Sequence, residues 1–394
     1  MTPAARVQAA IELLDAILDS ARQAGPAADT IVTRYFKERR YAGSKDRRAV
    51  RELVYRAIRR SGDRPRSGRA AMLGVAGEDE ALAALFDGSA HGPGAIEEGE
   101  DRAPWGPAPE WLRTRFDPLL DDVEVAALLE RAPLDLRVNT LKGSVEEAAE
   151  AFPGAVSTVL SPVGLRLPEA VQVEENPAFA RGLVEVQDEG SQLIALACGA
   201  RPGQLVIDLC AGGGGKTLAL GAEMANEGRL IASDADRGRL SRLPPRLGRS
   251  GLTIVETRLI NPGREVDDLH AFRTEADVVL VDAPCSGTGT WRRNPETRWR
   301  LTPERLQRLL KTQAHLLDVA TEFLKPGGVL VYAVCSLLKE EGRDQAEALA
   351  KRCSALVWED VPISGGRAAG PGRLLSPAHD GTDGFFIARW RAPC

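Results

Sequence analysis

The sequence predicts an α/β fold built on a mostly parallel sheet, preceded by a helical region and a small α+β unit. After about residue 183, apolar runs of strand length alternate with stretches of helix length, a pattern typical of parallel sheets with helices on both faces. Over the first 87 residues, apolar side chains instead recur at helical spacing. A chain of 394 residues is also too long for one ordinary domain.

Residues 1–87 are predicted to form a helical domain and residues 88–107 a linker. The first helix follows from apolar residues that recur every three or four positions between Val7 and Leu18. Ser44 is a favourable N-cap for a later helix. The linker is rich in Gly, Pro and Glu and lacks periodicity. The later helices are expected at Ala28–Arg40, Ser44–Arg60 and Ala70–Phe86.

Residues 108–182 are predicted to form the small α+β unit, and residues 183–394 the large sheet domain. Ligands of parallel sheets bind at the carboxyl ends of the strands, so the residues after each apolar run are the candidate site. In the small unit, helices are expected at Glu110–Phe116 and Asp122–Arg131, and strands at Leu134–Leu141 and Gly164–Leu167. In the large domain, strands are expected at Leu205–Leu209, Arg229–Ser233, Thr253–Glu256, Val278–Val281 and Val329–Val334, and helices at Lys216–Ala225 and Pro303–Leu324.

Composition excludes several classes of protein. No apolar run reaches membrane-spanning length, and the first residues lack the apolar stretch of a secretory signal. The six cysteines are scattered without a CxxC pair, which argues against a structural zinc site or a disulfide framework. We therefore expect a cytoplasmic monomer with free thiols, no metal and no membrane partner.

The net charge of −5 conceals two oppositely charged regions. Arg34–Arg66 holds 13 Lys and Arg against 4 Asp and Glu, whereas Glu78–Glu130 holds 14 acidic residues against 3 basic ones. The basic region is a candidate nucleic-acid surface, although many of its side chains are expected to form an ordinary solvated helix face. The acidic region is expected to be solvated and to repel nucleic acid.

A glycine-rich loop follows the first strand of the large domain. It runs Asp208-Leu-Cys210-Ala211-Gly212-Gly213-Gly214-Gly215-Lys216-Thr. A phosphate-binding P-loop would need glycine at position 210, so that interpretation fails. The next strand ends at Asp234, where a carboxylate suits the hydroxyls of a ribose. The glycine-rich loop and Asp234 together predict a nucleoside-containing cofactor, with a plain structural turn as the alternative.

Two cysteines follow two other strands of the same predicted sheet. Cys285 lies in Asp282-Ala-Pro-Cys-Ser-Gly, and Cys335 lies in Tyr332-Ala-Val-Cys-Ser. A lone cysteine after a strand is usually a small buried hydrophobe. Two cysteines at matching strand ends favour a functional pair. The sequence places no comparable motif around the remaining cysteines Cys198, Cys353 and Cys394.

These motifs resemble the RsmB/Nop/Sun family of RNA cytosine-5 methyltransferases. The resemblance covers most of the chain, and the two-cysteine arrangement is its most specific element. It implies a Rossmann-like class I methyltransferase sheet, and Ser44-Lys-Asp-Arg-Arg with Glu52-Leu-Val-Tyr resembles the NusB-like domain of the bacterial RsmB branch. Further matching stretches are Leu136-Arg-Val-Asn-Thr-Leu-Lys142, Glu185-Val-Gln-Asp-Glu-Gly-Ser-Gln192, Asp234-Ala-Asp-Arg-Gly-Arg-Leu-Ser-Arg242 and Leu324-Lys-Pro-Gly-Gly328.

The resemblance implies methyl transfer from S-adenosyl-L-methionine to carbon 5 of a cytosine in RNA. Carbon 5 is a poor nucleophile until a thiolate adds to carbon 6, which is covalent catalysis. The family assigns this addition to Cys335 and the later loss of the carbon 5 proton to Cys285. Asp282 is expected to hydrogen-bond the base, and Lys216 to add positive charge. The implied cofactor residues are Cys210, Ala211, Gly212, Gly213, Gly214, Gly215, Lys216, Asp234, Arg239 and Asp282.

The chain departs from the family pattern in its cofactor motifs. The family usually has Ala-Ala-Pro-Gly-Gly where this chain has Ala-Gly-Gly-Gly-Gly, and Leu259 stands about where an Asp is expected, with Asn261 as a partial substitute. These departures concern cofactor affinity more than reaction type. Ribosomal RNA of the small subunit is the favoured substrate. A transfer-RNA methyltransferase and a non-catalytic RNA-binding or assembly factor stay open as alternatives, whereas Cys335 argues against a DNA methyltransferase.

A second basic stretch, Trp291–Arg300, follows Cys285 and holds four arginines and two tryptophans. Arginine neutralises phosphate and tryptophan stacks on bases, so this stretch is expected to contact RNA beside the active site. The alternative is a loop whose tryptophans anchor it in a core. The target cytosine is expected to be single-stranded or flipped out, because carbon 6 is inaccessible inside a helix.

Overall fold

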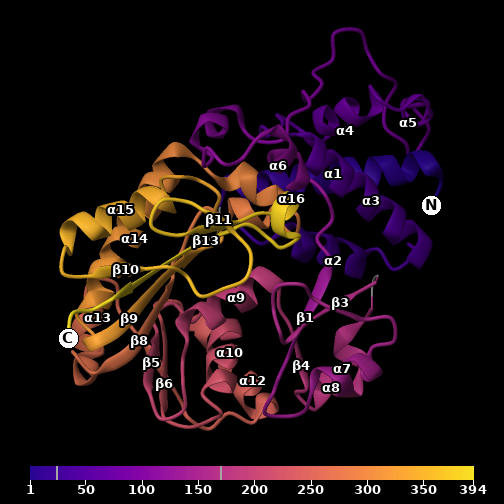
Figure 1. Cartoon of the computed structure of the whole chain (residues 1–394). Helices are drawn as coiled ribbons and strands as arrows, with labels where there is room; N and C mark the ends of the chain where they lie inside the picture. The colour runs from indigo at the N-terminus through magenta and orange to yellow at the C-terminus, as the bar shows by residue number, and fades with distance from the viewer. Residues whose placement is uncertain (24, 169–170) are drawn as a thin grey trace. The chain divides into compact units, whose positions relative to one another are not determined.

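The computed structural model describes residues 1–23, 25–168 and 171–394, and the chain divides into two compact units (Figure 1). The first, here called the helical unit, comprises Met1–Phe116, Leu120–Arg131 and Thr290–Pro303. The second, the sheet unit, comprises Asp117–Leu119, Ala132–Gly289 and Glu304–Cys394.

The helical unit confirms the predicted helices at the start of the chain. Thr2 caps the first helix by accepting a hydrogen bond from the Ala5 amide, and Pro3 occupies the first turn, where its missing N–H has no partner to lose. The apolar faces of the helices bury a common core that includes Leu14, Ile17 and Ile58. The helices are α1 (Pro3–Arg22), α2 (Ala28–Glu38), α3 (Ser44–Arg60), α4 (Gly68–Ala76) and α5 (Glu80–Ala83).

Two details of this region differ from the prediction. Gly43, not Ser44, is the N-cap of α3, because the Asp46 carboxylate accepts the Gly43 amide and leaves Ser44 as the first helical residue. The single helix expected at Ala70–Phe86 is divided into α4 and α5. Asp79 is the N-cap of α5, because its side chain accepts a hydrogen bond from the Leu82 amide at 3.0 Å.

Part of the basic stretch Trp291–Arg300 is packed into the core of the helical unit. The prediction that this stretch contacts RNA is therefore wrong for its buried side chains. Trp291 and Trp299 are buried, and the Trp299 indole donates to the Ser61 carbonyl at 3.0 Å. The Arg298 guanidinium, 1% exposed, donates to backbone carbonyls of Ile58, Arg59 and Pro107. Burial lowers the pKa of Arg298 to about 9. These side chains anchor the stretch, a 3₁₀ helix over Pro295–Arg300, in the core.

A small antiparallel sheet opens the sheet unit, in the strand order β2-β3-β1-β4. Both strands predicted here are confirmed, although β1 ends at Val138, and a strand at Val184–Val186 had not been expected. The strands are β1 (Leu134–Val138), β2 (Val156–Ser157), β3 (Gly164–Leu167) and β4 (Val184–Val186), with α7 (Val145–Ala151) and α8 (Pro177–Ala180). Before them, Glu110–Arg115 is a 3₁₀ helix and α6 (Asp122–Ala127) is shorter than predicted.

The large sheet has the order β11-β12-β13-β9-β8-β5-β6-β7, with β10 paired to β13. The five strands predicted from apolar runs are present and parallel, which confirms the expected fold class. They are β5 (Leu205–Asp208), β6 (Arg229–Asp234), β7 (Val255–Leu259), β8 (Ala276–Asp282) and β9 (Leu324–Val334). The antiparallel strands, which the sequence analysis did not expect, are β10 (Val357–Glu359), β11 (Arg367–Ala368), β12 (Arg373–Leu375) and β13 (Phe385–Arg391).

Helices flank the large sheet on both sides, with α9 and α10 on one side and α14 and α15 on the other (Figure 1). α9 and α10 contribute Leu193 and Leu220 to the apolar cluster of the sheet. This arrangement leaves the carboxyl edge of the parallel strands as the place for a site. The helices are α9 (Glu189–Cys198), α10 (Gly215–Glu223), α11 (Arg237–Leu240), α12 (Leu243–Ser250), α13 (Glu265–Asp268), α14 (Pro303–Thr321), α15 (Arg343–Arg352) and α16 (Pro377–Asp380).

Candidate active site at the carboxyl edge of the large sheet

The strand ends place the predicted site residues at one edge of the sheet. β5 ends at Asp208, β6 at Asp234 and β8 at Asp282, while Cys335 directly follows β9. The registers agree with this, because Asp234 pairs with Leu259 of β7 and Asp282 pairs with Ala333 of β9. Parallel pairing therefore brings together motifs that are far apart in the sequence.

The glycine-rich loop turns through two left-handed residues, Gly212 at φ +56° and Gly214 at φ +85°. Gly214 is the N-cap of α10, and a Cβ built there would lie 2.1 Å from Cδ1 of the buried Leu243. The Gly212 amide donates to Asp234 Oδ2 at 2.8 Å, and Arg239 lies 3.8 Å from the same oxygen. Asp234 thus anchors the loop that had been predicted to bind the same cofactor.

The two substituted positions of the cofactor region lie at the end of β7. Leu259 is 38% exposed and presents an apolar side chain beside Asp234. The Asn261 amide donates to Asp268 Oδ2 at 3.0 Å, so this side chain is already engaged within its own loop.

Lys216 and Asp282 form an ion pair at this edge. Lys216 Nζ donates to Asp282 Oδ2 at 2.6 Å, and both side chains are largely buried. Burial opposes the charge of Lys216, but the carboxylate of Asp282 more than offsets this and raises the lysine pKa. The pair fixes a positive and a negative group next to each other at the strand ends.

The two cysteines predicted to act together are in contact, with Cys285 Sγ 3.3 Å from Cys335 Sγ. The hydrogen bond to Cys335, followed by burial, raises the pKa of the Cys285 thiol well above its usual value. Either sulfur could donate the hydrogen bond that joins the two thiols. The two thiols predicted to act in turn therefore lie within hydrogen-bonding distance of each other.

The comparison with protein families is decisive at this point. The family described as 16S rRNA methyltransferase RsmB/F matches residues 195–391, which is 197 of the 394 residues. The chain belongs to this family. The matched segment contains the glycine-rich loop, the Lys216–Asp282 pair and both cysteines.

Relatives and solved structures agree with this membership. A ribosomal RNA small subunit methyltransferase B from Xylella fastidiosa (strain Temecula1) is 38% identical over 73% of this chain and 64% of that protein. The protein of the same name from Pasteurella multocida is 32% identical over 72% of this chain and 65% of that protein. The chain thus spans less than two thirds of the length of these relatives. The crystal structure of a methyltransferase homolog protein from Pyrococcus horikoshii is 29% identical, covers 68% of this chain and 89% of that chain, and superposes with a TM-score of 0.59.

Asp208, the last residue of β5 before the glycine-rich loop, had no predicted role. Asp208 is fully buried, and burial raises its pKa to about 7. Thr217 Oγ1 donates to Oδ2 at 2.7 Å, whereas Oδ1 has no hydrogen-bond partner among the described residues. Burial likewise raises the pKa of the Cys210 thiol well above its usual value.

Glu341, which follows Cys335 by six residues, was also missed. It is fully buried, and both of its carboxylate oxygens accept hydrogen bonds from residues around the two cysteines. The residues after Cys335 read Ser-Leu-Leu-Lys-Glu-Glu, which is typical of a surface turn. Nothing in that local pattern signals a buried carboxylate.

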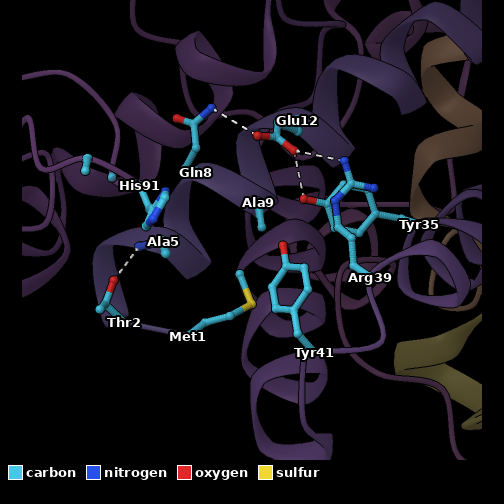
Figure 2. Close-up of a pocket in the computed structure, with 12 residues that line it drawn as sticks. Met1, Thr2, Ala5, Gln8, Ala9, Glu12, Tyr35, Arg39, Tyr41 and His91 are labelled. Atoms are coloured by element: carbon cyan, nitrogen blue, oxygen red, sulfur yellow. Dashed lines mark hydrogen bonds and ion pairs between the residues drawn. The ribbon is translucent and has the colours of Figure 1, made fainter.

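A hollow of about 1010 Å³ lies in the helical unit (Figure 2). Tyr35 donates to Glu12 Oε2 at 2.8 Å, and the Arg39 guanidinium lies 3.7 Å from the centre of the Tyr35 ring. Tyr41 is 73% exposed. None of the residues predicted for catalysis lines this hollow.

Among the described residues, no helix is both long and apolar enough to cross a membrane.

Proposed function

We propose that this protein transfers a methyl group from S-adenosyl-L-methionine to carbon 5 of a cytosine in RNA, with small-subunit ribosomal RNA as the favoured substrate. The observation that carries the proposal is the contact between the Cys285 and Cys335 sulfurs at 3.3 Å, beside the Lys216–Asp282 pair. A structural cysteine pair would not need a buried lysine and carboxylate next to it. The relatives' names and the family membership support the same reaction.

The cofactor site is proposed to be the glycine-rich loop with its neighbours at the strand ends. The loop fits a nucleoside ligand because its four consecutive glycines allow a ligand to approach the backbone closely, and because Asp234 at the next strand end holds Gly212. The residues proposed to hold the cofactor are Cys210, Ala211, Gly212, Gly213, Gly214, Gly215, Lys216, Asp234, Arg239 and Asp282. S-adenosyl-L-methionine supplies an electrophilic methyl group there.

The protein's own residues are proposed to activate the cytosine in turn. The Cys335 thiolate forms a bond to carbon 6, and the electron pair displaced from the 5,6 double bond makes carbon 5 nucleophilic. Asp282 accepts a hydrogen bond from the base, and Lys216 keeps that carboxylate in place. After methylation, Cys285 acts in removal of the carbon 5 proton. The electrons left on carbon 5 restore the double bond and expel the Cys335 sulfur.

The RNA is proposed to contact the exposed basic residues of Arg34–Arg66 in the helical unit. Lys37, Arg40, Arg47 and Arg48 are exposed, and Tyr41 offers a ring for stacking. A cytosine delivered single-stranded or flipped out would meet the requirement for access to carbon 6. Free thiols suit a reducing cytoplasm, where we propose that the protein acts as a monomer.

The proposal is tested by incubating the protein with labelled S-adenosyl-L-methionine and either small-subunit ribosomal RNA or transfer RNA. We expect the wild-type protein to label ribosomal RNA, Cys335→Ala to label none, and Cys285→Ala to accumulate a covalent protein–RNA adduct that resists denaturing electrophoresis. Labelling of transfer RNA alone would favour the transfer-RNA alternative. Absence of labelling with any RNA would favour a non-catalytic RNA-binding factor. An adduct in Cys335→Ala instead would mean that the two cysteines exchange roles.

A further inference from the structure

Glu341 lies in the loop after β9 that also carries Cys335, and it is fully buried there. Oε1 accepts from the Ser286 amide and from Gln313 Nε2, each at 2.9 Å. Oε2 accepts from the Ser336 hydroxyl at 2.5 Å and from the Ser286 hydroxyl. All four donors are neutral, so these hydrogen bonds take the place of a partner cation.

The donors to Glu341 are the immediate neighbours of the cysteines. Ser286 follows Cys285, and Ser336 follows Cys335. Gln313 of α14 also donates to the carbonyl of Pro284, the residue before Cys285, at 2.9 Å. One carboxylate therefore joins the loop after β8, the loop after β9 and α14.

Further hydrogen bonds join the same two loops. Thr288 Oγ1 lies 3.1 Å from Ser336 Oγ and accepts the Leu337 amide at 2.9 Å. The Gly289 amide donates to the Cys335 carbonyl at 3.1 Å. The Ser286 and Ser336 hydroxyls also lie 3.1 Å from each other, and Glu341 is the carboxylate that accepts from both of them.

We propose that Glu341 is a positioning residue that holds the Cys285 and Cys335 thiols in contact, an inference that rests on the proposed function of this pair. Two thiols that must act in turn on one base need fixed relative positions, and misplacement by about 1 Å can cost about 100-fold in rate. Among the described residues, the hydrogen bonds of the Glu341 carboxylate run to Ser286, Ser336 and Gln313. Its effect passes through Ser286 and Ser336, each one residue from a cysteine.

Glu341 would act through the geometry of the hydrogen bonds that its carboxylate accepts. In a Glu341→Gln variant, the amide oxygen still accepts from the Ser286 amide and Gln313, and the amide nitrogen donates to the two hydroxyls, which also accept. Glu341→Ala removes all four bonds. The glutamine variant should therefore resemble the wild type, and the alanine variant should not.

The spacing of the thiols is measured first, without RNA, by titration with phenylarsine oxide. Its arsenic(III) forms bonds to two neighbouring thiols, and its oxygen leaves as water with both thiol protons, so no oxidant is needed. We expect the wild type and Glu341→Gln to bind it with similar affinity, and Glu341→Ala to bind about 10-fold more weakly or worse, because separated thiols lose their effective concentration. Cys335→Ala should lose the chelate. Glu347→Gln, an exposed residue of α15, is the matched control and should behave as wild type.

Methyl transfer is then measured on the RNA that the wild type labels. We expect Glu341→Ala to lower kcat by about 100-fold while the KM for S-adenosyl-L-methionine stays near the wild-type value. A purely structural role would lower both binding and turnover. Should Glu341→Ala fail to fold, Ser336→Ala removes one of the four bonds and should give an intermediate loss of chelation.

Unchanged chelation and turnover in Glu341→Ala would overturn the inference, as would a Glu341→Gln variant that folds but is as impaired as Glu341→Ala. In the event of an unfolded Glu341→Ala, wild-type chelation in Ser336→Ala would overturn it as well. A wild-type protein that chelates arsenic but labels no RNA would refute the proposed function while leaving the positioning of the thiols by Glu341 supported.

Discussion

Asp208 is a buried carboxyl whose ionisation opposes folding. Burial raises its pKa to about 7, whereas an exposed aspartate titrates near 3.9. Between these values the folded protein binds a proton that the unfolded chain does not. The resulting stabilisation is fully present below about pH 4 and is lost as the pH rises through about 7.

Asp208→Asn should remove this pH dependence. Relative to the variant, the wild-type protein should lose about 2–3 kcal/mol of unfolding free energy between pH 5 and pH 8.5. The reason is that the buried Asp208 carboxyl must ionise over this range, whereas an asparagine at this position carries no ionisable group. Denaturant unfolding of both proteins at the two pH values, with reductant present, measures the difference. A constant difference between them across this range would show that the Asp208 carboxyl does not titrate there in the folded protein.

Other site residues differ in how far the sequence alone could identify them. Cys285, Cys335 and Asp282 follow apolar runs, so the rule for strand ends and the family motifs identify them directly. The Lys216–Asp282 bond joins residues 66 positions apart and follows from the pairing of β5 with β8. Glu341 lies in a polar stretch, and its burial depends on the loops of β8 and β9 packing around it. No local pattern carries that information.

Among the elements, the glycine-rich loop depends on its residue type at Gly214. Gly214→Ala would place an alanine at φ +85°, with its Cβ against the buried Leu243. We expect a loss of about 2 kcal/mol in stability and weaker binding of S-adenosyl-L-methionine, because the start of α10 must shift. Calorimetric titration with the cofactor and thermal unfolding test this.

Gly248→Ala is the matched control for the loop variant. Gly248 lies within α12, and a Cβ there would meet no atom within 4 Å. Alanine is a better helix former than glycine by up to about 1 kcal/mol, so this variant should be slightly stabilised and should bind the cofactor normally. Equal behaviour of the two variants would contradict the strict requirement at Gly214.

Element prediction succeeded where one residue pattern determines the structure and failed where distant partners do. The parallel strands are continuous apolar runs because both of their faces are buried. β11 and β12, by contrast, have two and three residues and are defined only by their pairing. Trp291–Arg300 reads as an exposed basic loop, yet Trp299 and Arg298 find partners more than 230 residues away.

At the scale of the whole molecule, the charge pattern is partly neutralised within the helical unit. Arg56 pairs with Asp79 at 2.6 Å, Arg60 with Glu78 at 2.9 Å, and Arg69 with Glu100 at 2.5 Å. The acidic region is therefore not simply a solvated surface, since part of it binds the basic helices. The local excess of positive charge is smaller than the sequence count implies. The exposed lysines and arginines of α2 and α3 are the residues that the proposed RNA contact would use.

Lys37 and Arg40 test whether this surface binds RNA. Both are exposed, at the end of α2 and just after it. Each phosphate contact that is lost should reduce the slope of log K against log salt by about 0.7–0.9. The double variant Lys37→Gln/Arg40→Gln should therefore bind RNA more weakly at low salt and with a shallower slope. Fluorescence anisotropy over a range of KCl concentrations measures both.

The control variant Lys351→Gln/Arg352→Gln removes the same charges from the exposed end of α15 in the sheet unit, and should leave the slope unchanged. Equal slopes for both double variants and the wild type would place the RNA contacts elsewhere, because the loss of net charge is the same in both variants and only its position differs.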